Sequence, residues 1–415
     1  MAVDTAVKRF NVVLLLRGGP ARPDASVEEA DRAALGGVYG GVGIDVPAAA
    51  GLTTATTVAQ LTTLIEASDL EMSWAVALYD SDEAFVADIS DDCSDGTLER
   101  NIYRTLHGTA RLSIARQLVW GSQRLGLSVT LTSDSELLTA TWQLGRWLMG
   151  VPQRRIGASV ETYEVECYDK LIVADALAGR SYVVASGTAY IDAVETIIST
   201  ELGETSVAID QASAATTLSA DMAWPLDAKT TWLSIINDLL AAINYEGLWV
   251  DRDGRFRSRP YSPPSSRATS WSFSADDAET TVIGADRTLV ADFTDTPNHW
   301  VFFRRDAAQA APATGAGRYE VTNLDDGPTS VTGRGRTITA VVGLDVATHA
   351  ALVSRGDDMV AAAKRLTQKL ELDTGPVPVL WHLDVVDLVD AAVGAHRRWA
   401  VEEWSCDLDT GAMRH

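Results

Sequence analysis

The sequence predicts an α+β protein of several domains, in which two β-rich regions are separated by smaller α/β regions. Short runs of alternating apolar and polar residues fill residues 74–169 and return after residue 337. Between them lies a helical stripe at residues 232–243, where apolar side chains recur every three or four positions. The chain has 415 residues, of which 46% are apolar and 22% charged, so it can form about two to four compact domains.

The changes of pattern give the expected domain boundaries. We expect an N-terminal extension at residues 1–65, a β-rich domain at 66–180, and a small α/β domain at 181–225. A helix-plus-hairpin domain should follow at 226–290, and a second β-rich domain with one inserted helix at 291–415.

The N-terminal extension shows little periodicity and contains a cluster of glycines. The cluster lacks the G-x-G-x-x-G spacing and leads into Ile44-Asp45-Val46-Pro47 instead of opening a helix. Nucleotide binding is therefore not predicted here.

In the first β-rich region, residues 109–120 place Ala110, Leu112, Ile114 and Leu118 on one face. A second alternating run at 127–131 follows a turn that contains glycine, and the pair predicts a hairpin. Residues 163–169 also alternate and predict a strand that ends at Asp169.

The middle of the chain mixes strands and helices. Residues 182–185 predict a strand, and Ile191, Val194, Ile197 and Ile198 form one helical stripe. The clearest helix is expected at 228–245, with Asp227 as N-cap and Gly247 as C-terminal stop.

After this helix, Asp253-Gly254 predicts a β-hairpin turn flanked by Trp249 and Phe256. Asp251, Asp253 and Gly254 also resemble the first half of a calcium loop. Arg255, Phe256 and Arg257 follow where further oxygen ligands are needed, so a turn is favoured.

The last region begins after a Pro/Ser linker at 260–270. Residues 307–335 are polar and rich in Gly and Ala, and predict an exposed loop. Strands are expected at 337–342, 377–389 and 399–408, and a helix at 346–372.

The final strand carries apolar side chains on both faces. Trp399 and Val401 point to one side, and Trp404, Cys406 and Leu408 point to the other, with Glu402-Glu403 at the change. A β-bulge or burial on both sides explains this pattern. Because one buried face could contact another subunit, the subunit-contact candidates are Trp399, Val401, Trp404 and Leu408.

Composition excludes several classes of function. A formal charge of -23 opposes the basic surface that nucleic-acid binding needs. Three cysteines far apart in the sequence, Cys93, Cys167 and Cys406, predict buried thiols and no disulfide framework or paired-cysteine zinc site. The apolar run at 12–16 is too short for a signal-peptide core or a membrane span, so we expect folding in a bacterial cytoplasm and no membrane anchor.

No catalytic, cofactor-binding or metal-binding residues are predicted. The six histidines are scattered and form no H-E-x-x-H pair, and no G-x-S-x-G elbow occurs. Adjacent carboxylates such as Asp91-Asp92 and Asp357-Asp358 fall where turns or helix faces are expected, as solvated charges do. The sequence therefore favours a protein that is not an enzyme.

Three stretches together resemble the tail hub, or baseplate hub, family of tailed bacteriophages, in a form similar to minor tail proteins of long-tailed actinobacteriophages. The first is RNIYRTLHGTA at residues 100–110, with the strands that end near Thr132. The second is VECYDKLIVADAL at 165–177, followed by a LysM-like stretch at 182–200, the Trp232 helix and the Asp253-Gly254 hairpin. The third is HLDVV at 382–386 with residues 404–413.

The resemblance covers about residues 75–415 and implies two tail-tube-like β-barrel domains separated by small α/β domains, one of them LysM-like. It implies a homotrimer that forms a pseudo-six-fold ring at the tail tip of a virion. This ring would join the tail tube and distal tail protein ring to the central fibre or spike, and would enclose the DNA exit channel. The tape measure protein and other minor tail proteins are further implied partners, and genomic DNA would pass without specific binding.

Other functions stay open. The LysM-like stretch could bind peptidoglycan, although a spacer role is favoured. A tail-associated cell-wall hydrolase would need a lytic constellation that the sequence does not display. A hub of a phage-derived injection machine or gene transfer particle would have the same sequence features.

Overall fold

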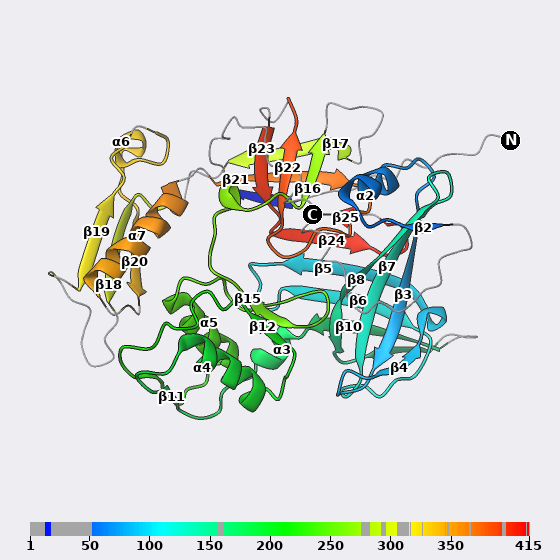
Figure 1. Cartoon of the computed structure of the whole chain (residues 1–415), viewed down its shortest axis with the longest axis horizontal. Helices are drawn as coiled ribbons and strands as arrows, with labels where there is room; N and C mark the ends of the chain where they lie inside the picture. The colour runs from blue at the N-terminus through cyan, green and yellow to red at the C-terminus, as the bar shows by residue number, and fades with distance from the viewer. Residues whose placement is uncertain are drawn as a thin grey trace.

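A computed structural model describes residues 13–17, 52–156, 161–274, 283–291, 296–304, 315, 317–325, 327–344, 346, 348–364, 367–391, 396–411 and 413–414. Among the described residues, 42% lie in strands and 19% in helices, so the fold is mostly β. One large sheet links the N-terminal and C-terminal β regions (Figure 1). Two smaller units, each with its own core, lie beside it.

The large sheet has 14 strands, in the order β1-β21-β25-β24-β5-β6-β10-β8-β7-β3-β4, with β17 on β21, β2 on β8 and β9 on β10. Their bounds are β1 (Val13–Arg17), β2 (Thr53–Thr54), β3 (Glu71–Tyr79), β4 (Phe85–Asp88), β5 (Cys93–Asn101), β6 (Gly108–Ile114), β7 (Arg124–Ser133), β8 (Leu138–Met149), β9 (Gln153–Ile156), β10 (Glu161–Asp169), β17 (Ile283–Ala291), β21 (Thr367–Thr374), β24 (Glu403–Asp407) and β25 (Met413–Arg414).

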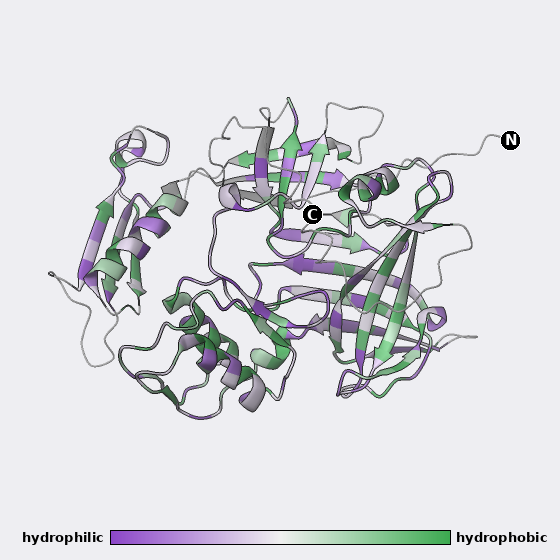
Figure 2. Ribbon diagram, viewed as in Figure 1, coloured by the Kyte–Doolittle hydropathy of each residue, from purple (hydrophilic) through white to green (hydrophobic). Residues whose placement is uncertain are grey.

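Helix α2 (Val58–Ile65) covers one end of β7 and β8. A capping box between Thr57 and Gln60 starts it, and Leu61, Leu64 and Ile65 face the core. A short 3-10 turn, η2 (Ser90–Asp92), carries the chain from β4 to β5. Apolar residues are concentrated on α2, β3 and β7 in Figure 2, which agrees with one continuous core beneath them.

The second unit lies at the bottom of Figure 1 and contains α3, α4 and α5. Its described residues from Leu171 to Phe256 share one hydrophobic core, with Trp232, Ile236 and Leu240 on the inner face of α5. Its elements are α3 (Leu171–Ala174), β11 (Tyr182–Val184), α4 (Tyr190–Thr196), the π-helix η3 (Ile197–Glu201), β12 (Val207–Ile209), β13 (Met222–Trp224), α5 (Trp232–Ala242), β14 (Trp249–Val250) and β15 (Phe256–Ser258).

The third unit lies at the left of Figure 1 and interrupts the C-terminal β region between β17 and β21. Helix α7 (His349–Lys364) packs on a sheet of order β19-β18-β20. The third unit also contains α6 (Val331–Arg334), and its strands are β18 (His299–Arg304), β19 (Arg318–Thr322) and β20 (Thr339–Leu344). The C-terminal β region outside this unit contains η4 (Pro264–Ser266), β16 (Trp271–Ser274), β22 (Val385–Val389) and β23 (His396–Ala400). Strands β16, β22 and β23 form a separate three-stranded sheet.

The expectation of two closed β-barrels is wrong for the part of the chain that the structure describes, where no sheet closes on itself. The edge of β5 that could have closed the first β region pairs instead with β24 of the second, from Thr97 with Asp407 to Asn101 with Glu403. One sheet therefore spans both regions. The β-rich, mixed, β-rich order of the chain is confirmed.

Several local predictions are confirmed. The 163–169 strand is β10, the 191–198 stripe is α4 with η3, and the clearest helix is α5. The Asp253-Gly254 turn joins the antiparallel strands β14 and β15.

Other local predictions are wrong. Strands β6 and β7 do not form a hairpin, because β6 pairs with β5 and β10, and β7 pairs with β3 and β8. The N-cap of α5 is Thr231 and not Asp227, whose carboxylate accepts bonds from the Lys229 and Thr230 amides in a preceding turn. The helix ends at Ala242, and Asn244, with a φ of 59°, takes the left-handed conformation common after a helix, so the stop comes earlier than the predicted Gly247.

In the C-terminal region, the helix expected at 346–372 is α7, which ends at Lys364, and β21 follows. Leu370 and Leu372 are buried at a spacing of two, which fits a strand. The loop expected at 307–335 contains β19 and α6, and only 385–389 of the strand expected at 377–389 is extended. The strand expected at 399–408 breaks at Val401-Glu402 into β23 and β24, which belong to two sheets.

None of the described helices is long and apolar enough to cross a membrane.

Candidate functional site

A buried ion cluster joins the large sheet to the second unit. Lys170, which is 0% exposed, places its Nζ 2.5 Å from Oε2 of Glu204 and 3.2 Å from Oε1 of Glu83. Arg124 donates to both carboxylates, with Nη2 2.9 Å from Oε1 of Glu204. Arg146 approaches Glu83 at 3.6 Å. Cations and carboxylates alternate, so each buried charge has an opposite neighbour.

The cluster draws on separate elements of the fold. Lys170 follows β10, Arg124 begins β7, and Glu83 lies in the turn between β3 and β4. Glu204 comes from the second unit, three residues beyond the end of η3. Glu83 has a φ of 64°, an uncommon conformation for a residue with a side chain, which its three cation partners help to hold.

Two glycines make room for Arg146 at this junction. Its guanidinium lies 3.7 Å from the ring centroid of Tyr79, which requires close approach to β7. A Cβ on Gly126 would lie 2.1 Å from Nη1 of Arg146. A Cβ on Gly254, whose φ is +80°, would lie 2.6 Å from its Cγ. The Asp253-Gly254 turn is therefore packed against the first β region.

A stack of three rings forms a second contact between regions. The Trp249 and His382 rings lie 4.7 Å apart at 12°, and the His382 and His107 rings 5.2 Å apart at 21°. These residues come from β14, the segment before β22 and the segment before β6. Beside them, Nε1 of Trp381 donates to the carbonyl of Val250 at 3.2 Å.

Burial lowers the pKa values of the two histidines in this contact. Desolvation, with a smaller effect of nearby Arg100, lowers the pKa of His107 to about 3. Desolvation also lowers the pKa of His382 well below its ordinary value. Both imidazoles are therefore neutral at pH 7.

Arg100 and Asp169 form a neighbouring buried pair, with Nη1 3.9 Å from Oδ2. Desolvation raises the pKa of Asp169 to about 6 in spite of the cation, and lowers the pKa of Arg100 to about 10. The Arg100 guanidinium also lies 4.2 Å from the Trp381 ring centroid. Packing as well as charge therefore holds Arg100 in place.

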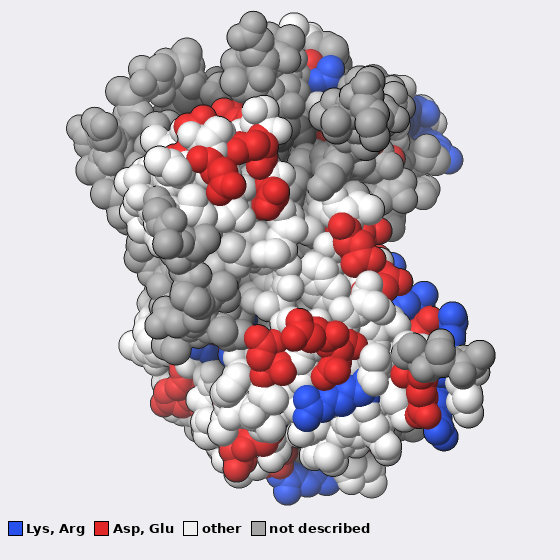
Figure 3. Space-filling view, turned by 90° about the vertical axis from the view of Figure 1, so that its right-hand side faces the viewer, with Lys and Arg blue, Asp and Glu red and all other residues white. Residues whose placement is uncertain are grey.

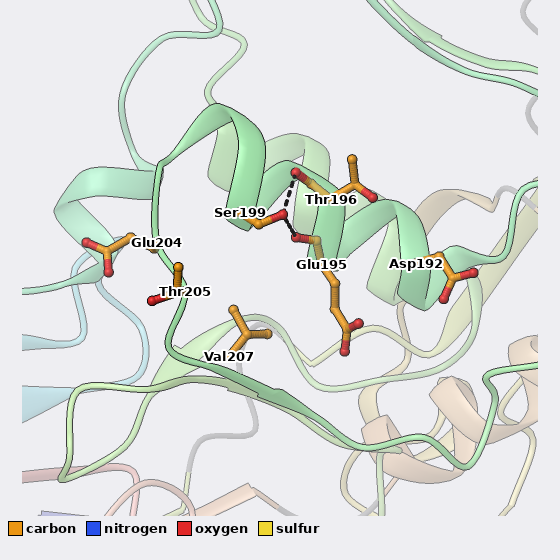
Figure 4. A pocket seen from close by; sticks show the side chains of 7 residues that line it. All are labelled: Asp192, Glu195, Thr196, Ser199, Glu204, Thr205 and Val207. Atoms are coloured by element: carbon orange, nitrogen blue, oxygen red, sulfur yellow. Dashed lines mark hydrogen bonds between the residues drawn. The ribbon is translucent and has the colours of Figure 1, made fainter.

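A polar hollow of about 500 Å³ lies beside α4 and η3, on the far side of Glu204 from the sheet (Figure 4). The Ser199 hydroxyl donates to the carbonyls of Glu195 and Thr196, so it is used within the helix. Residues 181–225 contain no Lys or Arg. The lining residues are Asp192, Glu195, Thr196, Ser199, Glu204, Thr205 and Val207.

The metal and thiol chemistry of the described residues is limited. No group of three His, Cys, Asp or Glu side chains among them could hold a metal ion. The cysteines are free, and burial raises the pKa of Cys93 and of Cys406 to about 12 and raises that of Cys167. Reactive thiolates are therefore not formed near neutral pH.

The resemblance of 251–254 to a calcium loop has a structural explanation. The Asp251 carboxylate accepts bonds from the amides of Asp253 and Arg255 and from Nε of Arg255. Its oxygens thus stabilise the hairpin turn, as the sequence favoured.

The four subunit-contact candidates lie inside this chain's own core. Trp399 and Val401 are 1% exposed, Trp404 2% and Leu408 1%. All four belong to the core beneath the large sheet. Their two-sided pattern arises because β23 and β24 belong to different sheets, and this burial leaves them no surface to offer a second copy.

Sequence reasoning missed the residues of the buried ion cluster, which form the junction between the large sheet and the second unit. Their partners lie far apart in the chain, as Glu83 and Lys170 do, and nothing local pairs them. The available signal was Asp169-Lys170, a pair of charged residues in which Asp169 ends the alternating pattern of β10 and Lys170 follows directly.

Comparison with known proteins places this architecture. No protein-family model and no curated protein matches the sequence. Among solved structures, the tail protein from Neisseria meningitidis MC58 superposes with a TM-score of 0.58 at 11% identity, over 82% of this chain and 94% of that one. The 43 kDa tail protein of prophage MuSo2 from Shewanella oneidensis gives a TM-score of 0.52 at 12% identity, over 82% and 96%. The chain therefore shares its fold with these two tail proteins.

Proposed function

We propose that this chain is a structural subunit of a bacteriophage tail tip, a hub protein that acts by assembly and not by catalysis. The observation that carries the proposal is the extent of the shared fold, which spans 82% of this chain and 94% of the Neisseria tail protein. A likeness over 82% of this chain and 94% of the other extends beyond any one of the three units described above.

The internal contacts suit a scaffold. The buried ion cluster around Lys170 and the Trp249–His382–His107 stack join regions that are distant in sequence. Pairing of β24 with β5 runs one sheet through both β regions. These contacts hold the units in fixed relative positions, which a component of a ring requires.

In the proposed assembly, three chains form a pseudo-six-fold ring at the tail tip. The ring joins the tail tube and distal tail protein ring to the central fibre or spike and encloses the DNA exit channel. Each chain contributes two β regions, linked by one sheet instead of two closed barrels. The tape measure protein and other minor tail proteins are the further partners.

The charge of the chain is consistent with such a channel. The formal charge is -23. The side of the molecule shown in Figure 3 displays more Asp and Glu than Lys and Arg among its described residues. DNA slides past an acidic wall without adhering, because like charges repel.

Electron microscopy of the tail tip tests the proposal. We expect three copies in a ring around the tail axis, and antibody labelling or density for this chain at that position. Absence of the chain from purified virions, or a location away from the tail axis, would contradict the proposal. A second experiment incubates the purified chain with cell-wall fragments. Strong binding to these fragments would favour the peptidoglycan-binding alternative.

A further inference from the structure

The third unit is an insertion whose two ends lie side by side. Strands β17 and β21 flank it and pair with each other, with Ala291 opposite Gln368. The unit has a core of its own, formed by Trp300, Phe302, Leu344, Leu352 and Val360. A hydrogen bond from Nη1 of Arg355 to Oδ1 of Asn244 links it to the segment that follows α5 in the second unit. The insertion therefore projects from the main body, as Figure 1 shows.

Strand β20 is an edge of this insertion and lacks the usual protection. Among the described strands it pairs with β18 alone. Helix α7 packs on β18 and β19. Val341 of β20 is 65% exposed, and Ala340 and Val342 are only half buried.

The sequence of β20, TAVVGL, contains no charged residue and no proline. Other edges carry charges, such as Arg154 and Arg155 on β9 and Arg318 and Glu320 on β19. Charged side chains are a common way to prevent an edge strand from pairing with another chain. Strand β20 is thus open to a further strand, which would also cover its half-buried side chains.

The charge of the insertion favours contact with an acidic chain. The whole protein has a charge of -23, so most surfaces of two copies repel each other. Residues 296–364 are neutral, because their basic side chains are balanced by an equal number of acidic ones. These are Arg304, Arg305, Arg318, Arg334, Arg336, Arg355 and Lys364 against Asp306, Glu320, Asp325, Asp326, Asp345, Asp357 and Asp358.

A complementary edge lies at the opposite end of the molecule's longest axis (Figure 1). Strand β4 ends the large sheet there, with Phe85 57% and Val86 48% exposed. Acidic residues lie at both of its ends, with Asp82 before the strand, Asp88 as its last residue and Asp91 after it. Strand β20 is preceded by the exposed Arg336 and followed in the sequence by Asp345, so the charge opposite to the acidic flank of β4 lies at the N-terminal end of β20, where a parallel pairing would bring Arg336 close to Asp82.

We propose that β20 of one copy pairs with β4 of a second copy, so that subunits associate head to tail. This inference rests on the proposed function, because a closed ring of identical chains needs a contact between two different surfaces. In this contact, exposed apolar side chains of the two strands lie at the centre, and an ion pair between Arg336 and Asp82 lies at the rim. Pairing of two β4 edges is opposed by their acidic flanks.

The test measures self-association of the purified full chain by sedimentation velocity over a wide concentration range. Val341→Lys places a charge at the contact and should weaken self-association by at least about tenfold. Val119→Lys is the matched control, because Val119 is 62% exposed outside any strand, and it should change nothing. Circular dichroism of both variants shows whether each keeps the fold.

A charge exchange gives the test its specificity. Arg336→Glu should weaken self-association, and Asp82→Lys in the same chain should restore it. Hydrogen exchange should slow at both 339–344 and 85–88 as the concentration rises.

The proposal is overturned if the chain stays monomeric at every concentration, if Val341→Lys associates as well as its control, or if both strands exchange equally fast in monomer and oligomer. A tail-tip ring seen by microscopy with its contact elsewhere would refute this inference and leave the proposed function intact. If the chain self-associates through β20 but is absent from virions, this inference stands and the proposed function fails.

Discussion

Lys170 and Glu204 meet across the boundary between two hydrophobic cores, with 2.5 Å between Nζ and Oε2. Lys170 is fully buried and lies at the end of β10, whereas Glu204 belongs to the second unit. Removing one partner of a buried pair leaves an uncompensated charge, which costs more than the pair itself contributes.

Lys170→Met should therefore lower the free energy of unfolding by about 3–5 kcal/mol. Chemical denaturation measures the change. Lys229→Met is the control, because Lys229 is exposed and should stay within about 0.5 kcal/mol of the parent. Adding Glu204→Gln to Lys170→Met should recover part of the loss, and strictly additive effects of the two changes would show that they do not interact.

The neutral state of His107 predicts a loss of stability in acid. Its pKa is about 3 in the folded protein against about 6.5 when unfolded. Between these values the unfolded chain binds a proton that the folded chain does not, so stability falls as the pH decreases from about 6.5 towards 3. The slope for one such group reaches about 1.4 kcal/mol per pH unit.

Asp169 acts in the opposite direction, because its pKa is raised to about 6. Its contribution is full below the unfolded pKa of about 3.8 and is lost as the pH rises to about 6. Denaturation curves at several pH values between 4 and 7 measure the free energy of unfolding over the ranges in which His107 and Asp169 contribute. His107→Phe should flatten the acid loss, and Asp169→Asn should steepen it; identical pH profiles for all three proteins would refute this account.

Gly254→Ala should disturb the junction more than an equivalent change elsewhere. Its φ is +80° and a Cβ would meet Cγ of Arg146 at 2.6 Å, so we expect a loss of about 2–4 kcal/mol. Gly179→Ala is matched in φ, at +65°, with nothing within 4 Å of the added Cβ. It should cost about 1 kcal/mol, and equal losses for the two variants would exclude a steric effect at Arg146.

Trp399→Ala should act on folding and not on assembly. The side chain is 1% exposed in the chain's own core, so the expected loss is about 3–5 kcal/mol in the free energy of unfolding. Thermal melting at several protein concentrations checks this. A loss that appears only at concentrations where the chain is oligomeric would return Trp399 to the role of a subunit contact.

Sequence patterns predicted those elements whose stabilising contacts are local. The apolar spacing in α5 and the Asp253-Gly254 turn between β14 and β15 are of this kind. The alternation of Leu370 and Leu372 was also present, but it followed a helical pattern without a break and was assigned to the helix. Only pairing with β1 and β17, which lie far away in the chain, shows that these residues form a strand.

The junction could not be predicted for the same reason. Whether Lys170 is a solvated or a buried lysine depends on Glu83 and Glu204, and one sequence contains no signal that brings these three together. The last strand was predicted to contain a β-bulge or to be buried on both sides. The apolar side chains of both faces are buried, but the strand is divided between two sheets, which removes the need for a second subunit to cover one face.

The pairing of β24 with β5 also has a consequence for the timing of synthesis. Thr97 lies opposite Asp407 in the register of the two strands, so the edge of β5 stays uncovered until the ribosome has translated as far as β24. Contacts so distant in sequence form slowly, and an open edge meanwhile invites pairing with other nascent chains. A product truncated before residue 403 would keep that edge open, so the large sheet can be completed only after β24 has been translated.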